Sequence, residues 1–462
     1  MPCGMGNNDE SISRRKFLEQ AGATVGAAAL GAACASDDES GPEQPNTTAG
    51  SEAAGQPGPA GSTGAGTGAS PMPSAGSGGR PGGAAGSTPA GGTGGSKPGA
   101  SGSGGAGTGA APAAGTGGST APVAGTGAVP AAGSGGTPPP SGKIIVGIVK
   151  KPNIDEAVAR AVELAGGLEE IKPGQTVFIK PNAVNDRALG MPGIRTSNEV
   201  LAAVVKLVKM RMPGKIIVGD RSARTFPDTE GILTRSGMRE AVMAAGADEV
   251  YGAKSPAEAP DEWMLLQPPM WEVSWRAAGG LYAMKKILEA DHLINVPTCK
   301  NHQNALYSLS MKAFMGGIGD SSRNSVHISN DFNAIGKDLA IMNQMFHPLI
   351  NIIDATTALI NGGPQGDRPD AVRTSPGIVF ASKDRVAVDA AAVSLIQLEL
   401  DTAMVPMPDP ANATLKRNPA WKMPQIVNGI DRKIGNATGP DTVQLMFDGV
   451  DKAAMIEAKF RA

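Results

Sequence analysis

Cysteine and aromatic residues are scarce in this sequence. Of its 462 residues, only three are cysteines (Cys3, Cys34 and Cys299), and aromatic residues make up 3%. Only Cys299 lies in the part of the chain with a globular composition, so a disulfide within that part is excluded. An iron–sulfur cluster held by that part's own cysteines is excluded for the same reason, because such clusters need several thiolates.

Large apolar side chains are missing from a long segment. The residues from Gly41 to Gly142 include no Ile, Leu, Phe, Trp or Tyr, but hold 33 of the 64 glycines. Such a segment cannot bury enough apolar surface to offset the backbone ordering cost of about 1–2 kcal/mol per residue. We therefore predict a signal peptide at 1–35, a disordered linker at 36–142 with a root-mean-square span of roughly 55 Å, and a folded domain at 143–462.

The domain also lacks an excess of charge of either sign. From Lys143 onward there are 36 Lys and Arg against 35 Asp and Glu, after subtracting five and eight from the totals of 41 and 43. Without a basic stripe or a basic amphipathic helix, neither nucleic acid nor a membrane surface is expected as a partner.

The N-terminus carries an export signal. The run from Ser13 to Leu18 (SRRKFL) matches the twin-arginine pattern and precedes a weakly apolar stretch from Ala21 to Ala33. That stretch is shorter than the about 20 residues a membrane span needs. The sequence therefore predicts export by the twin-arginine route.

Two fates of the exported chain remain open. Small residues run from Leu30 into Cys34, which resembles a lipobox and would make Cys34 a lipidated N-terminus. Cleavage after Ala35 would instead release a soluble periplasmic protein. The long linker favours the anchored lipoprotein, because an anchored domain needs reach, and lipid at Cys34 is then the only membrane contact expected.

From Lys143 onward, short apolar strands alternate with helices. This rhythm predicts an α/β fold with a mostly parallel sheet and helices on both faces. Residues 248–282, with Trp263, Trp271 and Trp275, break the rhythm and indicate an antiparallel insertion. The predicted strands are 143–149, 176–179, 215–219, 292–296, 349–353 and 377–381. The predicted helices are 153–165, 197–210, 229–235, 238–245, 283–289, 304–314, 332–345 and 387–398. Asn153 is the predicted cap of the first helix, and Ser197 or Asn198 is the predicted cap of the second.

Polar residues follow several of these strands. They are Lys180 and Asn182, Asp220 and Arg221, Lys300 and His302, and Asp354. In open α/β sheets, ligands bind beyond the carboxyl ends of the strands. These side chains are therefore predicted to converge at one edge of the sheet, although each also has an ordinary structural role open to it, such as helix capping.

Short motifs follow one another in a fixed order along the domain. They are Ile179-Lys180-Pro181-Asn182, Val218-Gly219-Asp220, Ile294-Asn295-Val296-Pro297, Lys300-Asn301-His302, Met311-Lys312, Gly316-Gly317, His327, Ile353-Asp354, Gly362-Gly363-Pro364-Gln365-Gly366 and Ala387-Val388-Asp389. Together these motifs resemble the domain of unknown function 362 family, over Lys143 to about Gln397. The resemblance implies no assigned reaction, and many members are labelled iron–sulfur proteins. This chain departs from that label because it has no C-x₂-C pair, so no cluster is expected from its own cysteines and its cofactor remains unknown.

The residue types suggest a division of roles. An ammonium or amide at a strand end can bind a carboxylate or phosphate, and imidazole is the usual acid/base group near neutral pH. Carboxylates and imidazoles together could also hold a divalent metal, although no tightly spaced metal motif is present. The candidates are Lys180, Asn182, Lys300 and Lys312 for the ligand, His302 and His327 for acid/base chemistry, and Asp220 and Asp354 for a metal.

The sequence thus predicts an exported α/β domain that binds a small anionic ligand, with or without a divalent metal. Two alternatives stay open, namely a ligand-binding or scaffold lipoprotein without turnover and a redox protein that relies on an external iron–sulfur partner. Whether the domain is an enzyme, and its substrate, are not determined by these patterns.

Overall fold

The computed structural model describes residues 142–187, 189–266, 281–326, 331–405 and 409–462. The predicted signal, linker and lipidation site lie outside these residues, as do Trp271, Trp275 and His327. Among the helices of the described ranges, none is both long and apolar enough to cross a bilayer.

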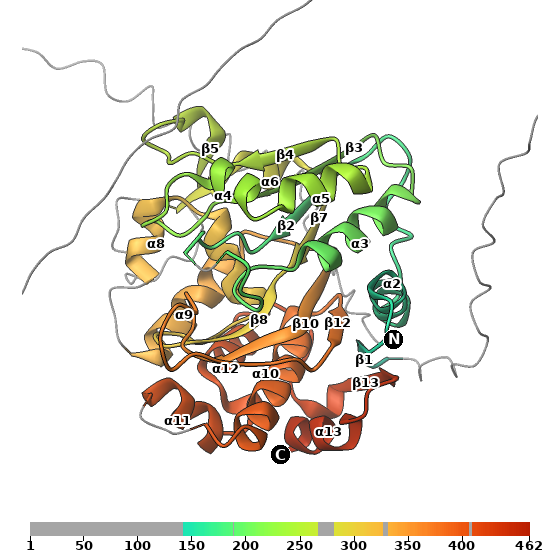
Figure 1. The fold of residues 1–462 in the computed structure, drawn as a ribbon, viewed down its shortest axis with the longest axis vertical. Helices are drawn as coiled ribbons and strands as arrows, with labels where there is room; N and C mark the ends of the chain where they lie inside the picture. The colour runs from blue at the N-terminus through green and yellow to red at the C-terminus, as the bar shows by residue number, and fades with distance from the viewer. Residues whose placement is uncertain (1–141, 188, 267–280, 327–330, 406–408) are drawn as a thin grey trace, which may run out of the picture. The chain divides into compact units, whose positions relative to one another are not determined.

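One large sheet organises the domain (Figure 1). All strands along its main path run in the same direction except β12, which is antiparallel to both neighbours. The prediction of a mostly parallel sheet is therefore confirmed. The order is β13 (Val443–Asp448), β1 (Ile144–Val149), β12 (Ile378–Ser382), β10 (Ile350–Asn361), β7 (His292–Val296), β2 (Thr176–Pro181), β3 (Lys215–Asp220) and β4 (Glu249–Gly252).

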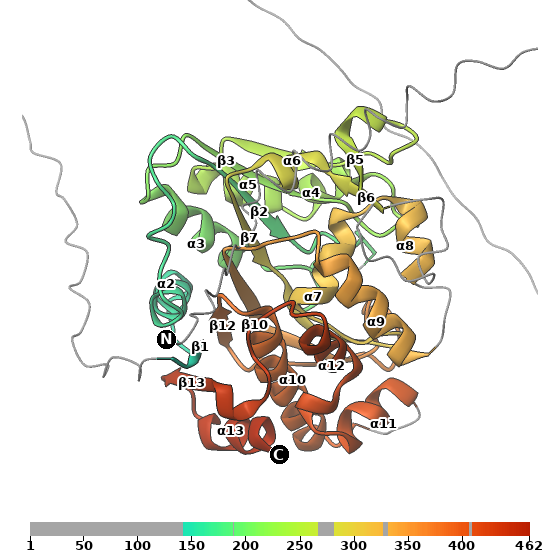
Figure 2. The ribbon, with the colours of Figure 1, turned by 180° about the vertical axis from the view of Figure 1, so that it is seen from behind.

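Alternating apolar side chains place helices on both faces of this sheet. In β2, Val177 and Ile179 join one core cluster and Phe178 joins another on the opposite face. Figures 1 and 2 show the two helical layers. One cluster packs under α2 (Ile154–Leu164), α3 (Asn198–Lys209), α4 (Thr229–Arg235) and α5 (Met238–Ala245). The opposite face is covered by α6 (Lys285–Glu289), α9 (Phe332–Asn343), α10 (Arg385–Thr402), α11 (Pro410–Arg417), α12 (Pro424–Asp431) and α13 (Ala453–Arg461).

The predicted helix starts follow from capping. Asn153 Oδ1 accepts the N–H groups of Asp155 and Glu156 at the start of α2. Ser197 Oγ accepts the N–H of Val200 at the start of α3. Each side chain satisfies donors that have no partner inside the helix.

The insertion was predicted correctly in kind but began too early. Strands β5 (Trp263–Leu266) and β6 (Leu281–Met284) form a separate antiparallel pair. However, β4 belongs to the main sheet, where it extends the edge beside β3 in parallel. The predicted helix at 283–289 begins only at Lys285, because the preceding residues pair with β5.

Two further predictions around residue 300 were wrong. The sequence predicts that Lys300 and His302 follow the strand at 292–296 and predicts no strand over them, but they lie in β8 (Thr298–His302), which pairs with β10 and β9 (Leu306–Ser308). The reason is the length of β10, whose second half continues past the main sheet and offers unpaired backbone groups to residues 298–302. The predicted helix at 304–314 is instead β9 followed by the short α7 (Ser310–Ala313) and a 3₁₀ turn at Phe314–Gly317.

We expect Asp384→Ala to lower the free energy of unfolding by about 2–4 kcal/mol. The buried carboxylate caps α10 at Ala387 N and also accepts the N–H groups of Asn436 and Ala437, so the substitution leaves three donors unsatisfied. Urea unfolding followed by tryptophan fluorescence measures the change. The matched control, Glu457→Gln in an exposed pair with Arg461, should stay within about 0.5 kcal/mol; equal stabilities of the two variants would contradict this account.

Candidate functional site

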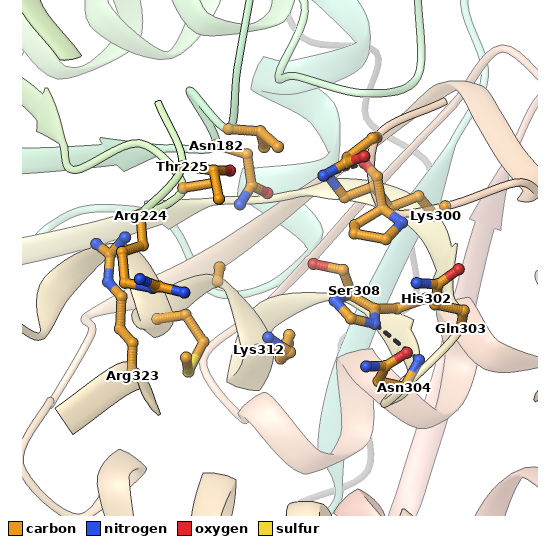
Figure 3. Close-up of a pocket in the computed structure, with 18 of the residues that line it drawn as sticks. Asn182, Arg224, Thr225, Lys300, His302, Gln303, Asn304, Ser308, Lys312 and Arg323 are labelled. Carbon is orange, nitrogen blue, oxygen red and sulfur yellow. Dashed lines mark hydrogen bonds between the residues drawn. The ribbon is translucent and has the colours of Figure 1, made fainter. Parts of the chain in front are cut away.

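A cavity of about 370 Å³ opens beyond the carboxyl ends of β2 and β3, beside β8 (Figure 3). Its lining comes from segments far apart in the sequence, as expected where parallel strands end at one edge. The residues that line it include one carboxylate, Asp220, and six cationic side chains. Those six are Arg221, Arg224, Lys300, Lys312, Arg323 and Arg368.

The single carboxylate is already neutralised from within the fold. Asp220 Oδ1 lies 2.6 Å from Lys180 Nζ, and Oδ2 accepts the N–H of Ala183 at 2.8 Å. Lys180 is fully buried behind the cavity and is not among the residues that line it. A Cβ on Gly316 would come within 1.9 Å of Asp220 Oδ1 and 2.7 Å of Lys180 Nζ, so only glycine fits over this pair.

Two arginines that line the cavity are held in fixed positions. Arg221 forms a two-point ion pair with Asp320, with distances of 2.6 and 3.1 Å. Arg323 donates to the carbonyls of Ile318, Arg221 and Ser222. These carbonyls satisfy donors but carry no net charge, and burial lowers the pKa of Arg323 to about 10. Its guanidinium therefore stays positively charged at neutral pH.

Lys300 is held by carbonyl oxygens. Its Nζ donates to Ile194 O at 2.7 Å and to Pro364 O at 3.4 Å. Burial lowers its pKa to about 7, and the charges of Lys312 and Arg195 act in the same direction. Lys300 is only 2% exposed, so its amino group has little access to water. Near neutral pH this group exchanges between the ammonium and the amine form.

Lys312 is positioned by a tethered turn of helix. Asp389 accepts the N–H groups of Ser310 and Met311, while Asn343 donates its side-chain amide to Met311 O. These contacts fix α7 and present Lys312 to the cavity. Burial lowers the pKa of Lys312 to about 7, with a smaller contribution from Arg323.

His302 has a defined tautomer. Its Nδ1 accepts the N–H of Asn304 at 3.2 Å, so this nitrogen keeps its lone pair and the neutral ring carries its proton on Nε2. Figure 3 draws the imidazole between Asn304 and Ser308, with the ring edge opposite Nδ1 turned toward the cavity. A neutral imidazole with a proton on Nε2 can donate a hydrogen bond to a bound molecule.

Of the remaining predicted residues, Asn182 lines the cavity but Asp354 does not. Asn182 lines the cavity, and its Oδ1 accepts the N–H of Thr298, which leaves the amide NH₂ as its donor. Asp354 is not among the lining residues; its carboxylate accepts Ser197 N at 2.7 Å and the Thr356 N–H and hydroxyl at 3.0 and 2.6 Å. Within the described ranges, no group of three or more His, Cys, Asp and Glu side chains is arranged to hold a metal ion.

The predicted His327 and the single cysteine of the domain, Cys299, do not belong to this set. His327 lies outside the described residues. Cys299 is buried next to Lys300 in the chain, and burial raises the pKa of its thiol well above the usual value, as in an inert structural cysteine.

Sequence reasoning missed part of the cavity wall. Arg224, Ser308 and Arg368 line it without any strand-end signal in the sequence. In the sequence, the Gly362–Gly366 segment stands out only as one motif of the family resemblance. In the structure, residues 362–365 form one side of the cavity. Gly363 N donates a hydrogen bond to Asn301 Oδ1. Arg221 is the one arginine of the cavity wall that the sequence could place there, because it follows Asp220 directly after a predicted strand.

Comparison with known proteins confirms the predicted resemblance. Residues 177–394 match the model of the family described as Domain of unknown function (DUF362). The thylakoid-associated protein sll1697 of Synechocystis sp. is 26% identical over 302 residues, covering 58% of this chain and 83% of that protein.

Two solved structures also show similarity at low scores. The lactate racemase apoprotein of Thermoanaerobacterium thermosaccharolyticum gives a TM-score of 0.35 at 13% identity, covering 54% of this chain and 57% of that one. A protein from Thermotoga maritima gives 0.29 at 11% identity, covering 45% and 50%. The matched region thus spans only about half of each of these two structures.

We expect Asp220→Asn to lower the free energy of unfolding by about 3–5 kcal/mol, because it leaves the Lys180 ammonium buried without its counter-charge. The double variant Lys180→Met/Asp220→Asn should recover part of this loss, since it removes the isolated charge. Urea unfolding of the two single variants and the double variant gives the coupling energy. The exposed Lys206–Asp155 pair, treated in the same way, should give about 0–1 kcal/mol; a similar value for the buried pair would contradict the account.

Proposed function

We propose that this domain binds a small anionic ligand, a carboxylate or a phosphate, in the cavity at the carboxyl ends of the strands. The observation that carries the proposal is the charge of the described residues that line the cavity, which include six cationic side chains against one carboxylate that is already paired with Lys180. Arg221 and Arg368 pair with Asp320 and Asp370, but these two carboxylates do not line the cavity. An anion in the cavity would add negative charge to this cationic lining, where charge is costly to bury without a partner.

The size and chemistry of the lining support a small ligand. A volume of about 370 Å³ lies at the lower end of the range of about 300–1,000 Å³ for small-molecule sites. Arginine and lysine donors match carboxylate and phosphate oxygens, and the Asn182 and His302 side chains add neutral donors.

An acid/base role for His302 is the second candidate. It rests on the hydrogen bond from Asn304 N to Nδ1, which places the ring proton on Nε2. An enzyme would use this proton during turnover, whereas a binding protein would use it only as a hydrogen-bond donor.

We also propose that the domain acts outside the cytoplasm. The twin-arginine signal and the apolar stretch that follows it in the sequence support export, and the small residues before Cys34 support a lipid anchor. The soluble periplasmic form is the alternative.

Ligand screening tests the binding proposal. Among sulfate, phosphate, malonate and citrate, at least one should raise the melting temperature of the full chain in a concentration-dependent way. Lys312→Gln should weaken that binding roughly 10- to 100-fold, as expected for losing one charge-assisted hydrogen bond of about 1.5–3 kcal/mol. The exposed Lys206→Gln should bind like the unmodified chain; absence of binding by every anion, or equal affinity of Lys312→Gln, would refute the proposal.

Anion affinity should fall as the pH rises from about 6 to about 8. The folded-state pKa values of Lys300 and Lys312 are lowered from 10.5 to about 7, so both ammonium charges are present below about pH 7 and are lost above it. Sulfate keeps its charge throughout this range, so titration calorimetry with sulfate isolates the protein's contribution. Proton uptake on binding near pH 7.5 should accompany the effect, and an affinity independent of pH would contradict these assignments.

Export is tested by replacing both Arg14 and Arg15 with Lys. We expect the variant to accumulate in the cytoplasm, whereas the unmodified chain should appear in the periplasmic or membrane fraction. Cys34→Ala should move the exported protein from the membrane fraction to the soluble fraction. An unchanged distribution of the double Lys variant would argue against the twin-arginine route, and an unchanged Cys34→Ala distribution would argue against the anchor.

A further inference from the structure

We propose that Lys300 is a nucleophilic amine that forms an imine with a small anionic carbonyl compound, of the 2-oxo acid class. This inference rests on the proposed anion site and specifies the chemistry of its ligand. It is carried by the placement of Lys300 in the cavity wall, by the acceptors around its Nζ and by the neighbouring cations.

Comparison with Lys180 shows what is unusual about Lys300. Both lysines are almost completely buried. Lys180 Nζ lies 2.6 Å from a carboxylate, which opposes the lowering of its pKa by burial, and it is separated from the cavity, as suits a structural ion pair. Lys300 lines the cavity, and among the described residues no carboxylate lies within 4.0 Å of its Nζ; only carbonyl oxygens accept from it.

The acceptors around Lys300 suit a neutral amine. An unprotonated amine has two N–H bonds and one lone pair, and the carbonyls of Ile194 and Pro364 can accept both N–H bonds. These two hydrogen bonds do not use the nitrogen lone pair, which belongs to a side chain that borders the cavity. The lowered pKa of Lys300, to about 7, is consistent with this state, and Lys312 contributes to it as a neighbouring cation. A lysine that is desolvated and close to another cation is a known form of activated nucleophile.

The rest of the cavity suits the other end of a 2-oxo acid. Arg224 and Arg323 lie on the side of the cavity opposite Lys300, with Lys312 between the two sides (Figure 3). Lys312, and farther away Arg224 and Arg323, thus give the carboxylate of such a ligand cationic neighbours in the same cavity as the amine. His302 lines the same cavity and carries a proton on Nε2.

The chemistry needs no further reagent. The Lys300 nitrogen lone pair attacks the carbonyl carbon, a C–N bond forms, and the oxygen becomes the hydroxyl of a carbinolamine after proton transfer from nitrogen. A proton is delivered to that hydroxyl, in a cavity that His302 also lines, and water leaves to give a protonated C=N bond. Loss of the proton from nitrogen then gives the imine, so that the proton taken up is returned. The net change is amine plus ketone to imine plus water, with no oxidation or reduction.

Borohydride trapping tests the inference. The full chain is incubated near neutral pH with glyoxylate, pyruvate or 2-oxoglutarate and reduced with sodium borohydride, which converts an imine into a stable secondary amine. Peptide mapping by mass spectrometry should find the adduct of at least one acid on Lys300, and a missed tryptic cleavage at that position should accompany it. Excess malonate, which lacks a ketone, should reduce the yield by competition.

Two variants and a direct binding measurement separate the possible failures. Lys300→Arg keeps a positive charge but cannot form the imine, so its adduct should fall to background. Lys206→Gln, an exposed position away from the cavity, should be trapped and should bind malonate like the unmodified chain. Anion binding without an adduct on Lys300, or with adducts only on other lysines, would overturn the imine and leave the anion site intact. Absence of both binding and trapping would overturn the site as well. If Lys300→Arg does not fold, the peptide map of the unmodified chain decides alone.

Discussion

The structure depends on how positive charge is accommodated at one edge of the sheet. Transferring an ammonium or guanidinium group from water into a protein interior is strongly unfavourable unless it is paired or neutralised. Within one small region, the cations of this domain have different kinds of hydrogen-bond and ion-pair partners. Lys180 has a carboxylate partner, Arg221 has Asp320, and Arg323 and Lys300 have carbonyl oxygens. Carbonyl oxygens carry no net charge, so the charge of the Lys300 ammonium borders the cavity without a carboxylate within 4.0 Å among the described residues.

The sheet creates this region by extending two neighbouring strands. The ladder between β7 and β10 pairs Ile294 with Ile350 and Asn295 with Asn351, after which β7 ends before Pro297 and the chain continues as β8. β10 continues as well and pairs with β8, with a change of register between Asp354 and Leu359. Lys300 and His302 therefore sit on an extension beyond the main sheet, where their side chains border the cavity that the loops after β2 and β3 complete.

Support from behind is as important as the lining itself. The short helix α7 could not hold Lys312 by its own hydrogen bonds, because one turn of helix is unstable in isolation. Asp389 from α10 and Asn343 from α9 instead anchor its backbone. Gly316 allows the next turn to cross directly over the Lys180–Asp220 pair, where any side chain would collide. Rigid support of this kind is what holds charged groups at fixed positions in a binding site.

The sequence by itself determined the α/β class, most of the helices with their caps, the family resemblance and the convergence of Asn182, Asp220, Lys300 and His302. These follow from local periodicity, local capping and the general rule that parallel strands end at one edge. Only the tertiary structure decided that Lys180 stands behind the cavity and that Asp354 caps a backbone segment rather than facing a ligand. It also decided that residues 298–302 form a strand, that β13 and α11 to α13 complete the domain, and that Arg224, Arg323 and Arg368 join the wall. The physical reason is that burial and pairing depend on partners distant in sequence: a lysine at a strand end has the same local signal whether its nitrogen meets a carboxylate, a carbonyl or an open cavity.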